Sequence, residues 1–204
     1  LEALTTGNNN TASGFFALLK NTEGSYNSAF GANALSNNTS GYNNVGVGSN
    51  ALYSNTTGAS NTSIGNGTMM ANTTGVNNVV AGSNAARTME TGSNNVVIGT
   101  NAFENADASY SIAIGSNSLK NDRAGSNIAI GDNALYSNVT GDLNTVLGRL
   151  AGTNILGSNN TLIGYRAGYS ETGSNKLYIS TGIAVYDGDE WVDTDDRNLL
   201  YGDF

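Results

Sequence analysis

Short apolar runs recur along this chain at a nearly constant interval, and a glycine follows each run. The glycines are 17 residues apart from Gly14 to Gly99, and then 16, 16, 17 and 16 residues apart up to Gly164. Such a constant interval is the mark of a repeat architecture. The chain therefore contains about ten units of 16–17 residues between residues 8 and 180. The repeated glycines are Gly14, Gly31, Gly48, Gly65, Gly82, Gly99, Gly115, Gly131, Gly148 and Gly164.

Each unit contains two short β-like segments that end in Gly/Asn turns. The first segment precedes the glycine and carries Thr, Val or Ile together with an aliphatic residue, as in Asn95–Ile98. The second segment follows the glycine and reads Asn-Ala-Leu in the clearest copies, as in Asn33–Leu35. Runs rich in Val, Ile and Thr between Gly and Asn indicate strands. Two glycines in most units disfavour a helix.

Stacking of these units leads to the fold class. Short strands on successive units pair in parallel about 4.8 Å apart, and a unit this small buries its apolar face only against its neighbours. The sequence therefore predicts an all-β fold, a parallel β-solenoid of about ten 16–17-residue coils that occupies residues 1–180. Residues 181–204 lack the repeat, and we expect them to form a non-repeating C-terminal β-hairpin or cap.

The repeated Gly and Asn residues have structural explanations. A coil that turns within two or three residues needs left-handed or crowded conformations, which Gly adopts without a Cβ clash. Four residues before each glycine lies an Asn, with Ser111 as the one substitute. Stacked Asn side chains hydrogen-bond to one another, which favours a structural ladder over a ligand-binding stripe. The column comprises Asn10, Asn27, Asn44, Asn61, Asn78, Asn95, Asn127, Asn144 and Asn160.

Apolar residues occupy both faces of the predicted strands. In Ser126–Gly131, the side chains of Ile128 and Ile130 point to one face and that of Ala129 points to the other. A thin coil has only one interior, so the second apolar face needs another cover. Self-association along the rod axis supplies this cover, and a homotrimer is the predicted arrangement. The alternative is a monomer whose exposed face tolerates small residues.

Composition narrows the possible functions. Only 12% of the residues are charged, and the 27 Gly and 33 Asn are unusually many. The chain lacks His, the commonest general base, and Cys, the residue of thiol nucleophiles and zinc–thiolate sites. The net charge of −8 disfavours nucleic acid or an anionic membrane as a partner. No apolar run approaches the ~20 residues of a membrane helix. Because the chain starts at Leu1, we expect it to be a piece of a longer or processed protein.

The repeats resemble those of a known group of fibrous proteins. Tyr110–Gly115 and Ser126–Gly131 are similar to the S-x-A-I-G repeats in the head of YadA-like trimeric autotransporter adhesins, although the unit here is longer. The segment Ala51–Gly58 resembles repeats of phage tail fibres and bacterial surface fibres. Lys176–Ile179 and Leu199–Phe204 are similar to what often follows those repeats. The resemblance covers nearly the whole chain. It implies a trimeric, left-handed parallel β-roll with an adhesive or spacer role outside the cell.

The segment that follows residue 180 holds the candidate ligand sites. Asp187, Asp189 and Glu190 surround a glycine and carry the oxygen ligands that Ca²⁺ prefers, but their spacing does not match an EF-hand loop. The competing interpretation is a solvated acidic turn between two short strands, with Trp191 as a packing anchor. Stacking of a carbohydrate on Tyr186 or Trp191 is the third interpretation. No other cofactor is expected.

These observations predict a structural and adhesive segment of a trimeric extracellular fibre, either a phage tail fibre or a bacterial surface adhesin. Its expected partners are its own copies and a glycan or protein on a target cell. No catalytic residues are predicted, since the adjacent Asp195 and Asp196 are typical of a charged surface. Two alternatives remain at this stage: an ice- or surface-binding β-solenoid, and a segment of a depolymerising tail spike with an acidic pair in a groove.

Overall fold

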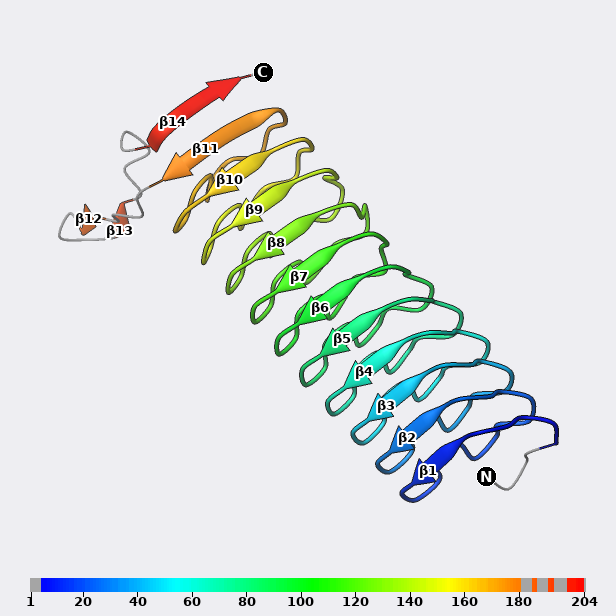
Figure 1. The fold of residues 1–204 in the computed structure, drawn as a ribbon. Coiled ribbons are helices and arrows are strands. Elements are labelled where there is room, and N and C mark those ends of the chain that lie inside the picture. Colours follow the sequence, from blue (N-terminus) through cyan, green and yellow to red (C-terminus); the bar gives the residue numbers. More distant parts are fainter. Residues whose placement is uncertain (1–4, 181–184, 187–190, 193–197, 204) are drawn as a thin grey trace.

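The computed structural model is a rod of stacked coils, each of which contributes one short strand to a single long sheet (Figure 1). It describes residues 5–180 and the backbone of residues 185–186, 191–192 and 198–203. The predicted all-β parallel solenoid of about ten coils is confirmed. No described segment is a helix with the length and hydropathy needed to cross a membrane. The strands of the solenoid are β1 (Thr11–Ser13), β2 (Ser28–Phe30), β3 (Val45–Val47), β4 (Thr62–Ile64), β5 (Val79–Ala81), β6 (Val96–Ile98), β7 (Ile112–Ile114), β8 (Ile128–Ile130), β9 (Thr145–Leu147), β10 (Thr161–Ile163) and β11 (Lys176–Ser180).

Neighbouring strands from β1 to β11 pair in parallel and without slippage. The central residue of each strand pairs with the central residue of the next, as Val80 does with Val97 and Ala113 does with Ala129. This register holds whether the intervening coil has 16 or 17 residues. Equivalent side chains therefore lie above one another in straight columns along the rod.

The predicted second strand of each coil is wrong. In Asn33–Leu35, φ is 60° at Asn33 and 52° at Leu35, so the chain enters the left-handed region twice within three residues. An extended strand needs negative φ throughout, and these residues instead form a tight double turn. Asn tolerates this conformation well. Leu35 is held in it by full burial inside the coil.

The hydrophobic core is one thin layer that runs along the inside of the rod. The central residue of each strand points inward, as Ala129 and Val146 do, and the leucine-type residue of the double turn meets it from the other side. Each coil therefore depends on the coils above and below for its burial. The large buried turn residues are Leu18, Leu35, Leu52, Met69, Phe103, Leu119 and Leu135.

The repeated glycine is required by close contact between coils as well as by its own conformation. Gly31 has φ of 135°, and a Cβ there would lie 2.6 Å from the carbonyl carbon of Gly48 in the next coil. No side chain fits at that distance. The 17-residue interval between the glycines in the sequence therefore reflects the stacking of these turns along the rod axis.

A strand of the C-terminal segment pairs with the end of the parallel sheet. Strand β14 (Asn198–Asp203) pairs with β11 in antiparallel orientation, with Tyr178 opposite Tyr201. The sequence did not predict this pairing. Strands β12 (Val185–Tyr186) and β13 (Trp191–Val192) form a separate antiparallel pair where a hairpin is expected.

Candidate functional site

The predicted asparagine ladder is present and buried. The side-chain Nδ2 of Asn44 donates to Asn27 Oδ1 at 3.2 Å and to the carbonyl oxygen of Gly58 at 2.8 Å. The backbone N–H of Asn44 also donates to Asn27 Oδ1, at 3.0 Å. The same set of bonds recurs at Asn61 and with slight changes at Asn95. These side chains are fully buried, so they stabilise the stack and do not form a ligand stripe.

The ladder changes where Ser111 replaces Asn. The side chain of Asn127 donates to Asp122 Oδ1 in place of an Asn in the preceding coil, at 3.1 Å. Its backbone N–H reaches Ser111 Oγ at 3.4 Å. The shorter hydroxyl of Ser111 therefore accepts the next backbone N–H but does not accept the Nδ2 of Asn127, which Asp122 accepts instead. The ladder resumes at Asn144, whose side chain donates to Asn127 Oδ1 at 3.1 Å.

A second asparagine ladder inside the first four coils was missed at the sequence level. Asn21, Asn38, Asn55 and Asn72 are buried, and each donates to the one before it at 2.6, 2.8 and 2.7 Å in turn. Their 17-residue spacing was available in the sequence as a signal. The ladder stops at Met89, and Asn72 Oδ1 is left buried without a hydrogen-bond partner.

A carboxylate compensates for the missing residue in one of the shorter coils. In the long coils three consecutive turn amides share one carbonyl oxygen of the next coil, as residues 39–41 do with the oxygen of Thr56 at 3.0–3.1 Å. The coil that starts at Gly99 is one residue shorter. Its Asp107 side chain accepts the amides of residues 90–92 in the preceding coil, which donate to Asp107 Oδ1 at 3.2, 3.0 and 2.9 Å. A side-chain oxygen thus takes the place of the carbonyl oxygen.

Asp122 is the one fully buried carboxylate among the described residues. It accepts hydrogen bonds from Asn127 Nδ2 and Asn138 Nδ2, both at 3.1 Å, and from Ser111 Oγ at 3.3 Å. Burial nevertheless raises the pKa of Asp122 above its ordinary value, because desolvation of the charge outweighs these bonds. It occupies the column of the second ladder and has no opening to solvent, so we assign it a structural role.

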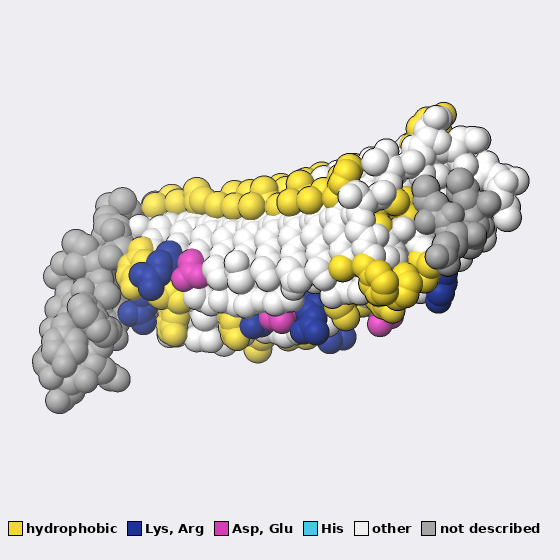
Figure 2. Space-filling view, turned by 90° about the horizontal axis from the view of Figure 1, so that it is seen from below, with side chains coloured by type: hydrophobic (Ala, Val, Ile, Leu, Met, Phe, Trp, Pro, Cys, Tyr) yellow, Lys and Arg dark blue, Asp and Glu magenta, His cyan; other side chains and the backbone are white. Residues whose placement is uncertain are grey.

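The outer face of the sheet is mostly apolar and is half-buried to exposed. The first and third residues of β1–β10 point outward, opposite to the buried central residue, as the alternation at Ile128–Ile130 predicts. We call these residues the outer sheet face. Figure 2 shows a band of hydrophobic side chains along one edge of the molecule for most of its length. Large members of this face are exposed by 37–47%, namely Phe30, Ile64, Val79, Ile98, Leu147 and Ile163.

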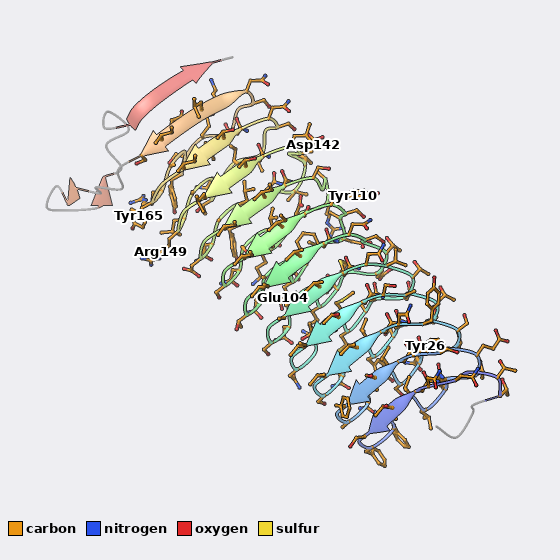
Figure 3. The ribbon with its side chains drawn as sticks, in the orientation of Figure 1. Tyr26, Glu104, Tyr110, Asp142, Arg149 and Tyr165 are labelled. Atoms are coloured by element: carbon orange, nitrogen blue, oxygen red, sulfur yellow. The ribbon has the colours of Figure 1, made fainter. Side chains whose placement is uncertain are left out.

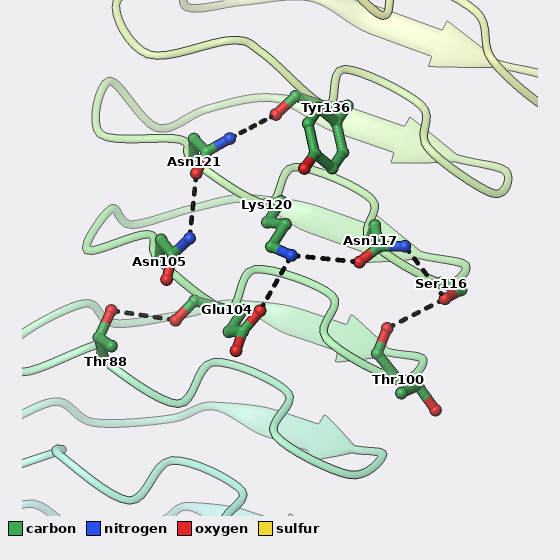
Figure 4. Close-up of polar contacts among 9 residues, drawn as sticks. All are labelled: Thr88, Thr100, Glu104, Asn105, Ser116, Asn117, Lys120, Asn121 and Tyr136. Carbon is green, nitrogen blue, oxygen red and sulfur yellow. Dashed lines mark hydrogen bonds and ion pairs between the residues drawn. The ribbon is translucent and has the colours of Figure 1, made fainter.

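Charged and tyrosine side chains are stacked on the turns of the later coils. Lys120 Nζ lies 3.1 Å from Glu104 Oε2 and 5.7 Å from the ring centroid of Tyr136 (Figure 4). Asn117 Oδ1 lies 3.5 Å from the same ammonium group. Glu104, Lys120 and Tyr136 occupy the same position in three successive coils. We call them the first charged file.

A second charged file repeats this order two coils further on. Arg149 Nε lies 3.6 Å from Asp132 Oδ2, and the Arg149 guanidinium lies 5.9 Å from the ring centroid of Tyr165. Figure 3 shows Arg149 and Tyr165 next to each other on turns at the side of the sheet, away from Tyr110. Sequence reasoning missed both files, although the known repeat step would have aligned their members.

The sequence-predicted ligand residues lie in the C-terminal segment. Tyr186 and Trp191 are register partners in the β12–β13 pair, so the backbone places these two aromatic positions opposite each other. Asp187, Asp189 and Glu190 lie outside the described residues. Within the described residues, no group of three or more acidic side chains is placed to hold a metal ion.

No protein-family model, curated protein or solved structure matches this chain. The class of protein is therefore defined by the fold itself. The chain is a parallel β-solenoid repeat protein that carries an exposed apolar sheet face and two charged files on its turns.

Proposed function

We propose that this chain is a structural and adhesive segment of an extracellular fibre, in which three copies pack along a common axis. The observation that supports this proposal most directly is the exposure of apolar side chains on the outer sheet face. Its apolar side chains lie in straight columns on strands that are already paired, so no further coil of the same chain can cover them. Contiguous exposed apolar patches mark interaction surfaces in soluble proteins.

Three parallel copies satisfy the geometry of a rod. A fibre whose copies all run in one direction needs a rotation axis parallel to the rod, and such interfaces pair different surfaces of neighbouring copies. The outer sheet face offers two different surfaces, the column of first residues and the column of third residues. In a closed ring of three, the first column of one copy meets the third column of the next. Complete burial of a large aliphatic side chain contributes roughly 1.5–3 kcal/mol, and the Val, Ile and Leu members of the columns repeat this gain along the rod.

The resemblance to trimeric adhesin heads and tail fibres supports the same proposal. A rod of nearly identical coils holds its surface at a defined distance from its ends, which suits a spacer or a receptor-contacting segment. The regular coils and their buried hydrogen-bonded ladders explain how such a segment stays rigid with no cysteines in the chain. The proposed partners outside the fibre are glycans or proteins of a target cell surface.

Sedimentation equilibrium of the full chain tests the assembly. We expect a mass of three chains, that is three times 20.9 kDa, at micromolar concentration. Ile98→Asp places a charge in the middle of the outer sheet face and should shift the equilibrium to monomer. Thr57→Asp adds the same charge on an exposed turn and should leave the trimer intact. A wild-type chain that stays monomeric while it is fully folded refutes the trimer.

A further inference from the structure

A further cation and ring follow Tyr165 in the last coil. Arg166 follows Tyr165 directly, and its guanidinium lies 4.4 Å from the ring centroid of Tyr169. Tyr165, Arg166 and Tyr169 all belong to the coil that starts at Gly164. Together with Asp132 and Arg149, these residues lie on three successive coils. We call these five residues the arginine–tyrosine surface.

Arg149 is the most accessible cation of this surface. Its side chain is 64% exposed, and that of its partner Asp132 is 41% exposed. Among the described residues, its guanidinium contacts only Asp132 through Nε and the Tyr165 ring. An exposed ion pair at 3.6 Å contributes little to stability. The terminal nitrogen atoms of Arg149 therefore remain open to a ligand.

We propose that the arginine–tyrosine surface binds an acidic saccharide, such as a sialylated or uronic acid-containing glycan. Guanidinium groups bind carboxylates through paired, charge-assisted hydrogen bonds, and Arg149 supplies an exposed guanidinium. The rings of Tyr165 and Tyr169 offer flat apolar surfaces with a polar tip, which suit the apolar face of a sugar ring. The Asp132 carboxylate accepts hydrogen bonds from sugar hydroxyl groups.

The acidic residue at one end of this surface, Asp132, favours a saccharide over a polyanion. A nucleic acid or a highly phosphorylated ligand presents several negative charges, which Asp132 and the net charge of −8 repel. A sugar acid presents one carboxylate and several hydroxyl donors, so it uses both Arg149 and Asp132. The whole surface is built on stacked coils, and binding therefore requires little ordering of the protein.

This inference rests on the proposed adhesive function and gives its target a chemical class. The residues of the surface lie on the turns that follow the strands, not on the strands themselves (Figure 3). Assembly through the outer sheet face therefore does not use their side chains. Three copies in one fibre would present three such surfaces, which raises the avidity for a surface that carries many glycans.

Calorimetric titration of the full chain with sialyllactose and with trigalacturonate tests the proposal, with neutral lactose as the control ligand. We expect one of the two acidic sugars to bind more tightly than lactose, and the affinity to fall as salt is added. Arg149→Ala and Tyr165→Ala should each weaken binding about tenfold or more, because the first loses a charge-assisted contact and the second loses the ring that packs on the sugar. Tyr165→Phe should retain most of the affinity, since it keeps the ring.

Arg87→Ala is the matched control variant, because Arg87 is an exposed arginine on an earlier coil outside this surface. It should bind like the wild type. The proposal is overturned if neither acidic sugar binds with a dissociation constant below about 10 mM, which corresponds to a binding free energy of about 3 kcal/mol. It is equally overturned if Arg149→Ala and Tyr165→Ala bind as the wild type does. Sedimentation of the same samples reports assembly separately, so a failed saccharide site is distinguishable from a failed fibre.

Discussion

Replacing one asparagine of the first ladder would measure what the ladder contributes. Asn61 is fully buried in the middle of the rod. Its Nδ2 donates to Asn44 Oδ1 at 3.2 Å and to the carbonyl oxygen of Gly75 at 2.8 Å. Its Oδ1 accepts from the backbone N and the Nδ2 of Asn78, both at 3.0 Å. Asn61→Ala removes all four of these hydrogen bonds.

The expected loss follows from the groups that the substitution leaves behind. The backbone N–H of Asn78 loses its acceptor in the interior, where water does not replace it, while the carbonyl oxygen of Gly75 keeps a 3.5 Å bond from Asn72 Nδ2. An unsatisfied buried polar group costs about 1–3 kcal/mol, so the Asn78 N–H alone predicts a loss of about 1–3 kcal/mol. Asn61→Ser should lose less, because Ser111 shows that a hydroxyl in this column still accepts the next backbone N–H.

Urea unfolding followed by circular dichroism provides the assay, with Asn66→Ala as the matched control. Asn66 is the same residue type one position after the next glycine, and it is exposed. Its replacement should change the free energy of unfolding by less than about 0.5 kcal/mol. Long repeat stacks can unfold in steps, so hydrogen exchange at the amide of Asn78 should be measured in parallel. Equal effects of Asn61→Ala and Asn66→Ala would refute the structural role of the ladder.

Substitutions at three further positions test other parts of the stack. Burial raises the pKa of Asp122 above 3.8, so the stability of the wild type falls as pH rises from that value through the folded-state pKa. Asp122→Asn should therefore unfold at a higher urea concentration than the wild type at pH 7, and at a similar urea concentration at pH 3. Asp107→Ala should speed hydrogen exchange at the amides of residues 90–92 and lower the free energy of unfolding by about 1–3 kcal/mol. Asp107→Asn keeps an acceptor and should lose less. Unchanged exchange in the alanine variant would contradict the role of the carboxylate. Gly31→Ala forces a Cβ against the Gly48 carbonyl at an unfavourable φ and should lower the urea midpoint by an amount equivalent to about 2–5 kcal/mol, and a midpoint equal to that of the wild type would show that the coils can separate.

The strands and their two faces were predictable because they depend on local alternation and on the repeat step. Ile128, Ala129 and Ile130 show the inward and outward positions directly, and the step of the glycines gives the register. The turn at Asn33–Leu35 was not predictable as a turn, because Ala and Leu have no intrinsic preference for it. Closure of a narrow coil imposes the left-handed conformation on Leu35, and burial of its side chain compensates for the strain.

The contacts on the surface and in the turns were harder to predict for a different reason. Asp107 accepts hydrogen bonds from three amides because its coil is one residue shorter than the coil before it. The sequence shows the shorter coil, but only the three-dimensional structure shows which side chain replaces the missing carbonyl oxygen. Lys120 and Tyr136 are 16 residues apart, so their contact follows from the repeat step once that step is applied to the polar positions as well. The sites in residues 187–190 remain predictions.

The uniform register from β1 to β11 has a consequence for how the molecule can evolve. Each coil presents the same backbone edge above and below, so a duplicated coil can enter the stack without redesign of its neighbours. One residue more or less in a turn is absorbed locally, as at Asp107, and leaves the columns straight. Rod length therefore becomes a count of repeats in the gene, and reach can be selected independently of surface chemistry.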